Sequence, residues 1–159
     1  MVELLVVTTM IAIMASVLLF IINPATQFQK GRDTRRKADL SQIQGPLEFY
    51  RSDYGYYPVA SYFSTCNTAF TVGSTTYLAK IPCDPLAPGT TPYRYKPTRV
   101  SDATTTCTTG CDNLTPSTQC VKYCLVACLE IVTDPDKDQA NDSAVCNGTT
   151  RWSKTVKNL

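Results

Sequence analysis

The chain has 159 residues, of which 43% are hydrophobic, and its 15 basic and 13 acidic side chains leave a formal net charge of +2. Because the positive and negative charges nearly cancel, they produce no strong electrostatic field that would attract nucleic acid. Histidine is absent, which excludes Ser-His-Asp and Cys-His catalysis and c-type haem attachment.

The first distinct segment is apolar. From Leu4 to Ile22 there is no charged residue, and Glu3 stands directly in front. Because a helix needs about 20 apolar residues to cross a bilayer, we expect this segment to span or nearly span a membrane. A cleaved signal peptide would carry a basic start and a shorter apolar run, so that interpretation is less favoured.

A second helical segment follows. Asn23-Pro24 predicts a kink or local melting, because Pro24 cannot donate a backbone hydrogen bond. Gly45-Pro46 predicts a bend or a local break, and Gly55 suits a C-terminal cap near Asp53–Gly55. An apolar face is predicted from residues at alternating spacings of three and four, which are Leu40, Ile43, Leu47, Tyr50 and Tyr54.

Residues 56–159 have a different character and contain all eight cysteines. Strand-like runs occur at Tyr93–Lys96 and Cys120–Val132, and a Thr-rich loop at Ser101–Thr118 lies between them. In the longer run, successive side chains should point to opposite faces. We therefore predict an α+β fold, with a long N-terminal helix over residues 1–55 and a small β-rich, disulfide-stabilised head over 56–159.

Three stretches together resemble the type IV pilins and the major pseudopilins of type II secretion. Met1–Ala15 reads MVELLVVTTMIAIMA, and Arg35–Pro58 contains RRKADLSQIQGPLEFY followed by DYGYYP. The third stretch is YLAKIPCDP at Tyr77–Pro85, with PYRY at Pro92–Tyr95. That family usually has a phenylalanine several residues ahead of the signature glutamate. Here only Met1 and Val2 precede Glu3, so we expect that the leader and first mature residues are missing or that the start is atypical.

The resemblance implies a pilin-like fold and a structural role rather than catalysis. The chain would be a subunit of a helical extracellular filament, a homo-oligomer built through the N-terminal helices. Before assembly it would sit in the cytoplasmic membrane, in contact with the lipid bilayer and with a membrane assembly machinery. Assembly would depend on Glu3 as a charge partner between subunits, together with Met1 and Pro24.

Two other classes stay open. A pseudopilin would form a short, transient filament within a type II secretion or competence apparatus. A signal-anchored extracellular binding module or enzyme would stay monomeric and tolerate replacement of Glu3. The sequence offers no convincing catalytic constellation for an enzyme.

A basic cluster occupies the start of the second helical segment. We expect a solvated face, or charge pairing between neighbouring subunits, because acidic residues interrupt the cluster and no aromatics interleave for base stacking. Nucleic acid binding is therefore unsupported. The cluster consists of Lys30, Arg32, Arg35, Arg36 and Lys37.

The cysteines are predicted to form disulfides. Zinc sites favour CxxC knuckles, and none occurs here. We expect all eight to be oxidised within the head, with at least one bridge between the Thr-rich loop and the Cys120–Val132 strand. They are Cys66, Cys83, Cys107, Cys111, Cys120, Cys124, Cys128 and Cys146.

A single acidic loop raises the question of calcium. Its sequence TDPDKDQAND lacks the glycine and terminal glutamate of an EF-hand. The resembled pseudopilins bind calcium in a C-terminal loop, so Ca2+ is a possible cofactor, although a solvated loop is the favoured interpretation. The candidate ligands are Asp134, Asp136, Asp138 and Asp142.

Overall fold

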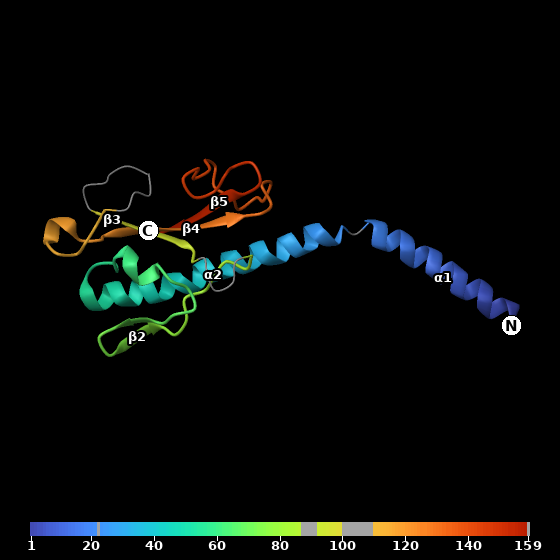
Figure 1. Ribbon diagram of the computed structural model, residues 1–159, viewed down its shortest axis with the longest axis horizontal. Helices are drawn as coiled ribbons and strands as arrows, with labels where there is room; N and C mark the ends of the chain where they lie inside the picture. Colours follow the sequence, from blue (N-terminus) through green and yellow to red (C-terminus); the bar gives the residue numbers. More distant parts are fainter. Residues whose placement is uncertain (22, 87–91, 100–109, 159) are drawn as a thin grey trace.

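A computed structural model describes residues 1–21, 23–86, 92–99 and 110–158, and for residues 18–21 it describes the backbone alone. The chain is α+β, with two helices followed by two small antiparallel sheets (Figure 1). The elements are α1 (Val2–Ile21), α2 (Pro24–Tyr54), η1 (Ala60–Phe63), β1 (Phe70–Val72), β2 (Thr75–Leu78), β3 (Arg94–Thr98), η2 (Pro116–Thr118), β4 (Lys122–Leu129) and β5 (Trp152–Lys157).

The N-terminal helical region is two helices rather than the single long helix expected. Pro24 occupies the start of α2, where its missing N–H costs nothing. Asn23 precedes it in an extended conformation, and its side-chain oxygen accepts a hydrogen bond from the backbone N–H of Thr26. The predicted interruption at Asn23-Pro24 is thus a complete helix boundary.

Gly45-Pro46, where a bend or a local break was predicted, does not end the helix. Helix α2 contains Pro46 and continues to Tyr54. The hydrogen bond that Pro46 cannot make is offset by tertiary packing, because Ile43 and Leu47 on either side are almost fully buried. Gly55 caps the helix in the left-handed conformation, with φ of 81°, as predicted.

Helix α2 and the sheets share one core. The predicted apolar face is confirmed for Leu40, Ile43, Leu47 and Tyr50, which are all buried. Tyr54 is 42% exposed and stacks on Tyr50 at a centroid distance of 4.5 Å. The second half of α2 therefore belongs to the head as a packing unit.

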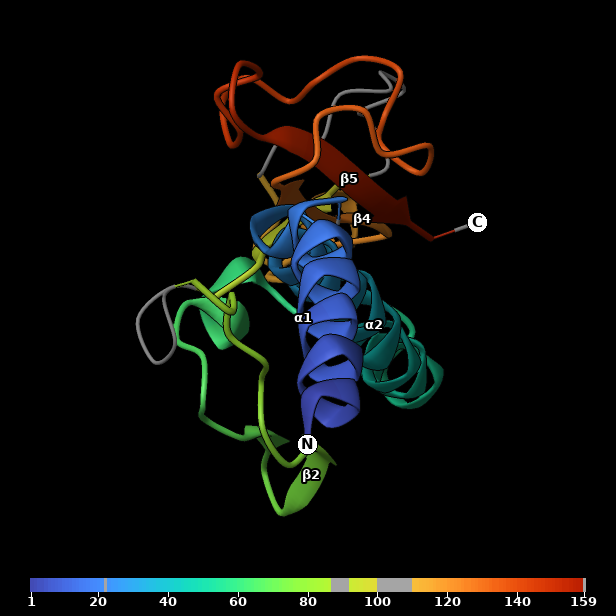
Figure 2. The ribbon, with the colours of Figure 1, turned by 90° about the vertical axis from the view of Figure 1, so that its right-hand side faces the viewer.

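The larger sheet has the order β3-β4-β5 and is antiparallel throughout. Both predicted strand runs are present, as β3 and β4. Alternate residues of β4 face opposite sides as expected: Leu125 and Ala127 enter the main core, whereas Val126 enters a second cluster with Cys146. Figure 2 shows the sheet between α2 on one side and the C-terminal loops on the other.

Three strands were not expected from the sequence. The hairpin strands β1 and β2 have 3 and 4 residues, too few for a clear alternation. Strand β5 reads WSKTVK and looks polar. It forms because it pairs along its length with the buried β4.

Disulfides lie in the C-terminal part, as predicted. Three bridges are described: Cys66–Cys83, Cys111–Cys120 and Cys128–Cys146. The second connects the Thr-rich loop to the residues that lead into β4, which is the kind of bridge expected. Cys124 is also disulfide-bonded, and no cysteine in the described ranges is free. Cys107 lies outside those ranges.

No helix in the described part of the chain is both long enough and apolar enough to cross a membrane. The expectation that Leu4–Ile22 spans a bilayer is therefore not confirmed.

Candidate assembly surface

Helix α1 is apolar around its whole circumference and projects away from the head (Figure 1). The side chains of residues 1–17 are all exposed, and Leu4 and Met14 are each 72% exposed. So large an exposed apolar surface marks an interaction site. The exposed large side chains are Met1, Val2, Leu4, Leu5, Val6, Val7, Met10, Ile11, Ile13, Met14 and Val17.

The hydroxyl groups of α1 form hydrogen bonds within the helix itself. The hydroxyls of Thr8, Thr9 and Ser16 each donate to the backbone carbonyl three residues earlier, at 3.0, 2.8 and 2.7 Å. A hydroxyl bonded in this way needs no water or outside partner. The described surface of α1 can therefore enter an apolar environment without stranding a hydroxyl group.

Glu3 is the exception. It lies in the first turn of α1, and no hydrogen bond or ion pair joins it to any described residue, including the α-amine of Met1. Every other described side-chain carboxylate has a partner within the chain. Those partnered residues are Asp33, Asp39, Glu48, Asp53, Asp84, Asp112, Glu130, Asp134, Asp136, Asp138 and Asp142.

A buried ionic cluster fastens α2 to the head. Arg36 is fully buried and donates to Asp84 through Nε and Nη2, both at 2.9 Å. Its Nη1 reaches Asp33 and Glu130, both at 2.7 Å. Arg32 adds two hydrogen bonds to Glu130 at 2.8 and 2.6 Å. We call these five residues the Arg36 cluster.

The arginines of the Arg36 cluster favour the ionised forms of Glu130 and Asp84. Hydrogen bonds from Arg32, and then from Arg36, lower the pKa of Glu130 to about 2, although burial opposes them. Burial also opposes ionisation of Asp84, but hydrogen bonds from Arg36 and the backbone of Leu86 lower its pKa on balance. The cluster thus holds α2 and the end of β4 in one fixed arrangement at neutral pH.

The predicted role of the basic residues needs correction. Arg32, Arg36 and Lys37 pair with carboxylates of their own chain instead of forming a solvated face or an intersubunit contact. Lys30 and Arg35 are exposed, and no ion pair joins them to a described residue. Sequence patterns missed this pairing because the partners other than Asp33, which lies three positions before Arg36, are 48 to 99 positions away.

The four candidate calcium ligands of the acidic loop have other partners. The Lys37 ammonium bonds Asp134 at 2.7 Å and Asp136 at 2.8 Å. Asp142 pairs with Lys96 at 2.7 Å. No group of three or more possible metal-ligating side chains comes together in the described ranges.

The fourth aspartate, Asp138, forms hydrogen bonds with β5. Asp138 accepts hydrogen bonds from the hydroxyls of Ser153 and Thr155 and from the backbone N–H of Thr155, at 2.8, 2.6 and 3.0 Å. Asn141 accepts from the backbone N–H of Ser153 at 2.8 Å. These two side chains therefore satisfy the outer edge of β5.

Comparison with known proteins identifies no relative. No known protein family matches the chain, and neither a curated protein nor a solved structure is significantly similar to it.

Proposed function

We propose that this protein is a structural subunit of an extracellular helical filament of the type IV pilus kind, which polymerises through α1. The observation that carries the proposal is an apolar helix, exposed over residues 1–17, that begins with a carboxylate, Glu3, for which no partner exists among the described residues. Such a helix is unstable in water as an isolated element and needs an apolar environment.

Contact between copies of α1 supplies that environment. Burying one exposed leucine or isoleucine side chain contributes about 1.5–3 kcal/mol, and α1 exposes many of them. A copy held in lipid before assembly exchanges lipid for other helices of the same kind, so the apolar surface never meets water. A head-to-tail contact that does not close on itself then generates an open helical fibre.

Glu3 sets the register of this packing. An ionised carboxylate in an apolar core is costly without an opposing charge, and its own chain provides none among the described residues. The resemblance supplies the partner, which is the α-amine at the mature N-terminus of an adjacent subunit. An apolar helix alone could slide along its neighbour, whereas the ion pair fixes one axial position.

Replacement of Glu3 tests the proposal. Glu3→Gln should leave the folding of the head intact and abolish fibres in electron micrographs of material shed from the producing cells. Asp53→Asn is the matched control, because it removes an exposed carboxylate whose described partner is only the Tyr77 hydroxyl. Fibres of normal length and number from Glu3→Gln would refute the charge-pair mechanism.

A further inference from the structure

Strand β3 forms one edge of the larger sheet, since it pairs with β4 alone in the order β3-β4-β5. Its residue Pro97 lies opposite Tyr123 and has no N–H to donate. Proline is tolerated in a strand where its nitrogen faces away from the neighbouring strand. Thr98 faces β4, because its carbonyl accepts from the N–H of Val121 at 3.0 Å.

The backbone N–H and C=O groups of successive residues point to opposite edges of a strand. Those of Tyr95 therefore point the same way as those of Pro97, away from β4. Outside the β3–β4 pairing, no hydrogen bond between described residues uses the backbone N–H or C=O of Tyr95. The isolated bridge between Cys83 and Pro92 lies before the start of the strand. One donor and two acceptors therefore point away from β4, the N–H and C=O of Tyr95 and the C=O of Pro97, and both residues are buried.

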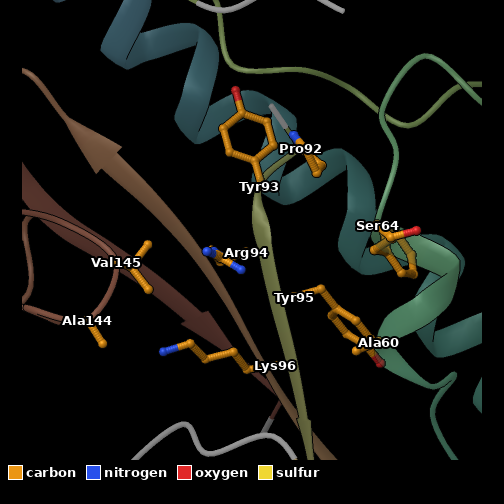
Figure 3. A pocket seen from close by; sticks show the side chains of 10 residues that line it. Ala60, Ser64, Pro92, Tyr93, Arg94, Tyr95, Lys96, Ala144 and Val145 are labelled. Carbon is orange, nitrogen blue, oxygen red and sulfur yellow. The ribbon is translucent and has the colours of Figure 1, made fainter. Parts of the chain in front are cut away.

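This edge lines a hollow of about 600 Å³. In Figure 3, β3 runs along this hollow, with Ala60 and Ser64 on one side of the strand and Ala144 and Val145 on the other. The volume lies in the range of sites that hold ligands. Phe63 adds an apolar ring to the η1 side of the wall.

The side chains of β3 divide between the two sides of the strand. Arg94 and Lys96 point toward Val145, and Tyr95 points toward Ala60 (Figure 3). Lys96 is neutralised by Asp142 at 2.7 Å. Arg94 is exposed, and no hydrogen bond or ion pair joins it to a described residue. The Tyr95 hydroxyl is already used, since it donates to the carbonyl of Pro58 at 2.8 Å.

We propose that the outward edge of β3 binds an extended peptide segment of a partner protein, with an acidic residue facing Arg94. The peptide residue opposite Tyr95 would exchange two backbone hydrogen bonds with it and place its side chain toward Phe63, which favours an apolar residue. The adjacent residue would project to the opposite side, where the Arg94 guanidinium is the free charge.

A second copy of β3 fits this edge poorly. Two such strands side by side would bring Arg94 and Lys96 of both copies together, and like charges across strands destabilise pairing. Pro97 also shortens the edge that can pair, which is a common protection against open-ended association. A short acidic segment brings no like charge to Arg94, and it does not need a longer edge than the one that ends at Pro97.

The test uses the full chain in detergent micelles and two fluorescent peptides, Val-Glu-Val-Glu-Val and Val-Lys-Val-Lys-Val. Fluorescence anisotropy should show at least tenfold tighter binding of the glutamate peptide. Arg94→Glu should reverse this preference, because it replaces the free cation by an anion. Lys30→Glu makes the same charge change on α2 and should leave the preference unchanged.

Amide hydrogen exchange locates the contact. Bound glutamate peptide should slow the exchange of the Tyr95 N–H at least tenfold. Three results would overturn the proposal: no binding at millimolar peptide, binding that ignores Arg94→Glu, or binding that leaves Tyr95 exchange unchanged. The proposal would also be overturned if the chain dimerised and the peptide reversed that dimerisation. The edge would then be assigned to self-association.

Discussion

Arg36 on α2 and Asp84 in the segment before β3 are joined by two hydrogen bonds of 2.9 Å, and the arginine is completely buried. The pair ties the middle of the helix to a part of the chain that lies 48 positions further on. Because Glu130 joins the same guanidinium, one side chain fixes three separate segments. The position of the head on α2 thus depends on charge as well as on apolar packing.

Removal of this arginine should be strongly destabilising. Arg36→Met leaves the carboxylates of Asp33, Asp84 and Glu130 without their buried counter-charge, and breaking a buried pair in this way costs about 3–5 kcal/mol. Chemical denaturation of the variant should show a loss of that size. Arg35→Met, at the adjacent exposed position, should change the free energy of unfolding by less than about 0.5 kcal/mol. Equal effects of the two substitutions would contradict a structural role for the cluster.

The same cluster predicts an acid-sensitive fold. Hydrogen bonds from Arg32, which has the larger effect, and from Arg36 lower the pKa of Glu130 from its ordinary value of 4.5 to about 2. A group whose pKa is lower in the folded state stabilises the fold above its unfolded pKa, and this contribution is lost as the pH falls toward the folded pKa. Thermal unfolding should therefore occur at lower temperature as the pH drops from about 5 to about 2. Glu130→Gln should flatten that dependence; a dependence unchanged in the variant would assign it to other groups.

Local patterns in the sequence predict the elements that depend on local periodicity. The spacing of Leu40, Ile43 and Leu47 identifies the buried face of α2, and the glycine at position 55 identifies its end. The apolar run that contains β4 is recognisable because both of its faces are buried.

The ionic contacts and the polar strand could not be predicted in this way. Arg36 reads as one member of an exposed basic run, and only the fold brings Glu130 to it from 94 positions away. Strand β5 has no apolar signal of its own. Its outer edge is satisfied by side chains, those of Asp138 and Asn141, which sequence periodicity does not reveal.

Calcium should have little effect on the stability of the head. The Lys37 ammonium already pairs with both Asp134 and Asp136, and Lys96 pairs with Asp142. Addition of millimolar calcium should therefore leave the Tm unchanged, and Lys37→Met should lower the free energy of unfolding by up to about 1 kcal/mol. Lys30→Met, which removes an exposed lysine without a described partner, is the control. An upward shift of the Tm with calcium that a chelator reverses would restore the metal-binding interpretation.

All eight cysteines should be oxidised in the mature protein. Mass spectrometry after alkylation without reduction should find no modified cysteine, and one alkylated cysteine would disprove complete pairing. The Cys128–Cys146 bridge closes a loop over 18 positions and should contribute about 3 kcal/mol to stability. Replacing both residues by alanine should reveal that contribution in denaturation experiments.

Two aromatic side chains on α2 should take part in filament assembly if the proposed function is right. Phe28 and Phe49 are 69% and 68% exposed, although both lie on a helix whose opposite face is buried in the head. Three heptads separate them, which places them about 60° apart around the helix axis, outside its buried stripe. Exposed phenylalanines of this kind gain about 1.5–3 kcal/mol each when a neighbouring copy covers them.

Phe28→Ser and Phe49→Ser should therefore leave the Tm of the head within a few degrees of the original and reduce the number and length of fibres. Leu114→Ser is the matched control, because Leu114 is 82% exposed but lies in the loop before η2 and on neither long helix. Electron microscopy of shed material would measure fibre number and length for all three variants. Normal fibres from both phenylalanine variants would show that the outer face of α2 stays uncovered, so that subunits meet through α1 alone. A loss of fibres with Leu114→Ser as large as with the phenylalanine variants would mean that the assay reports general surface changes, and the assignment to α2 would fail.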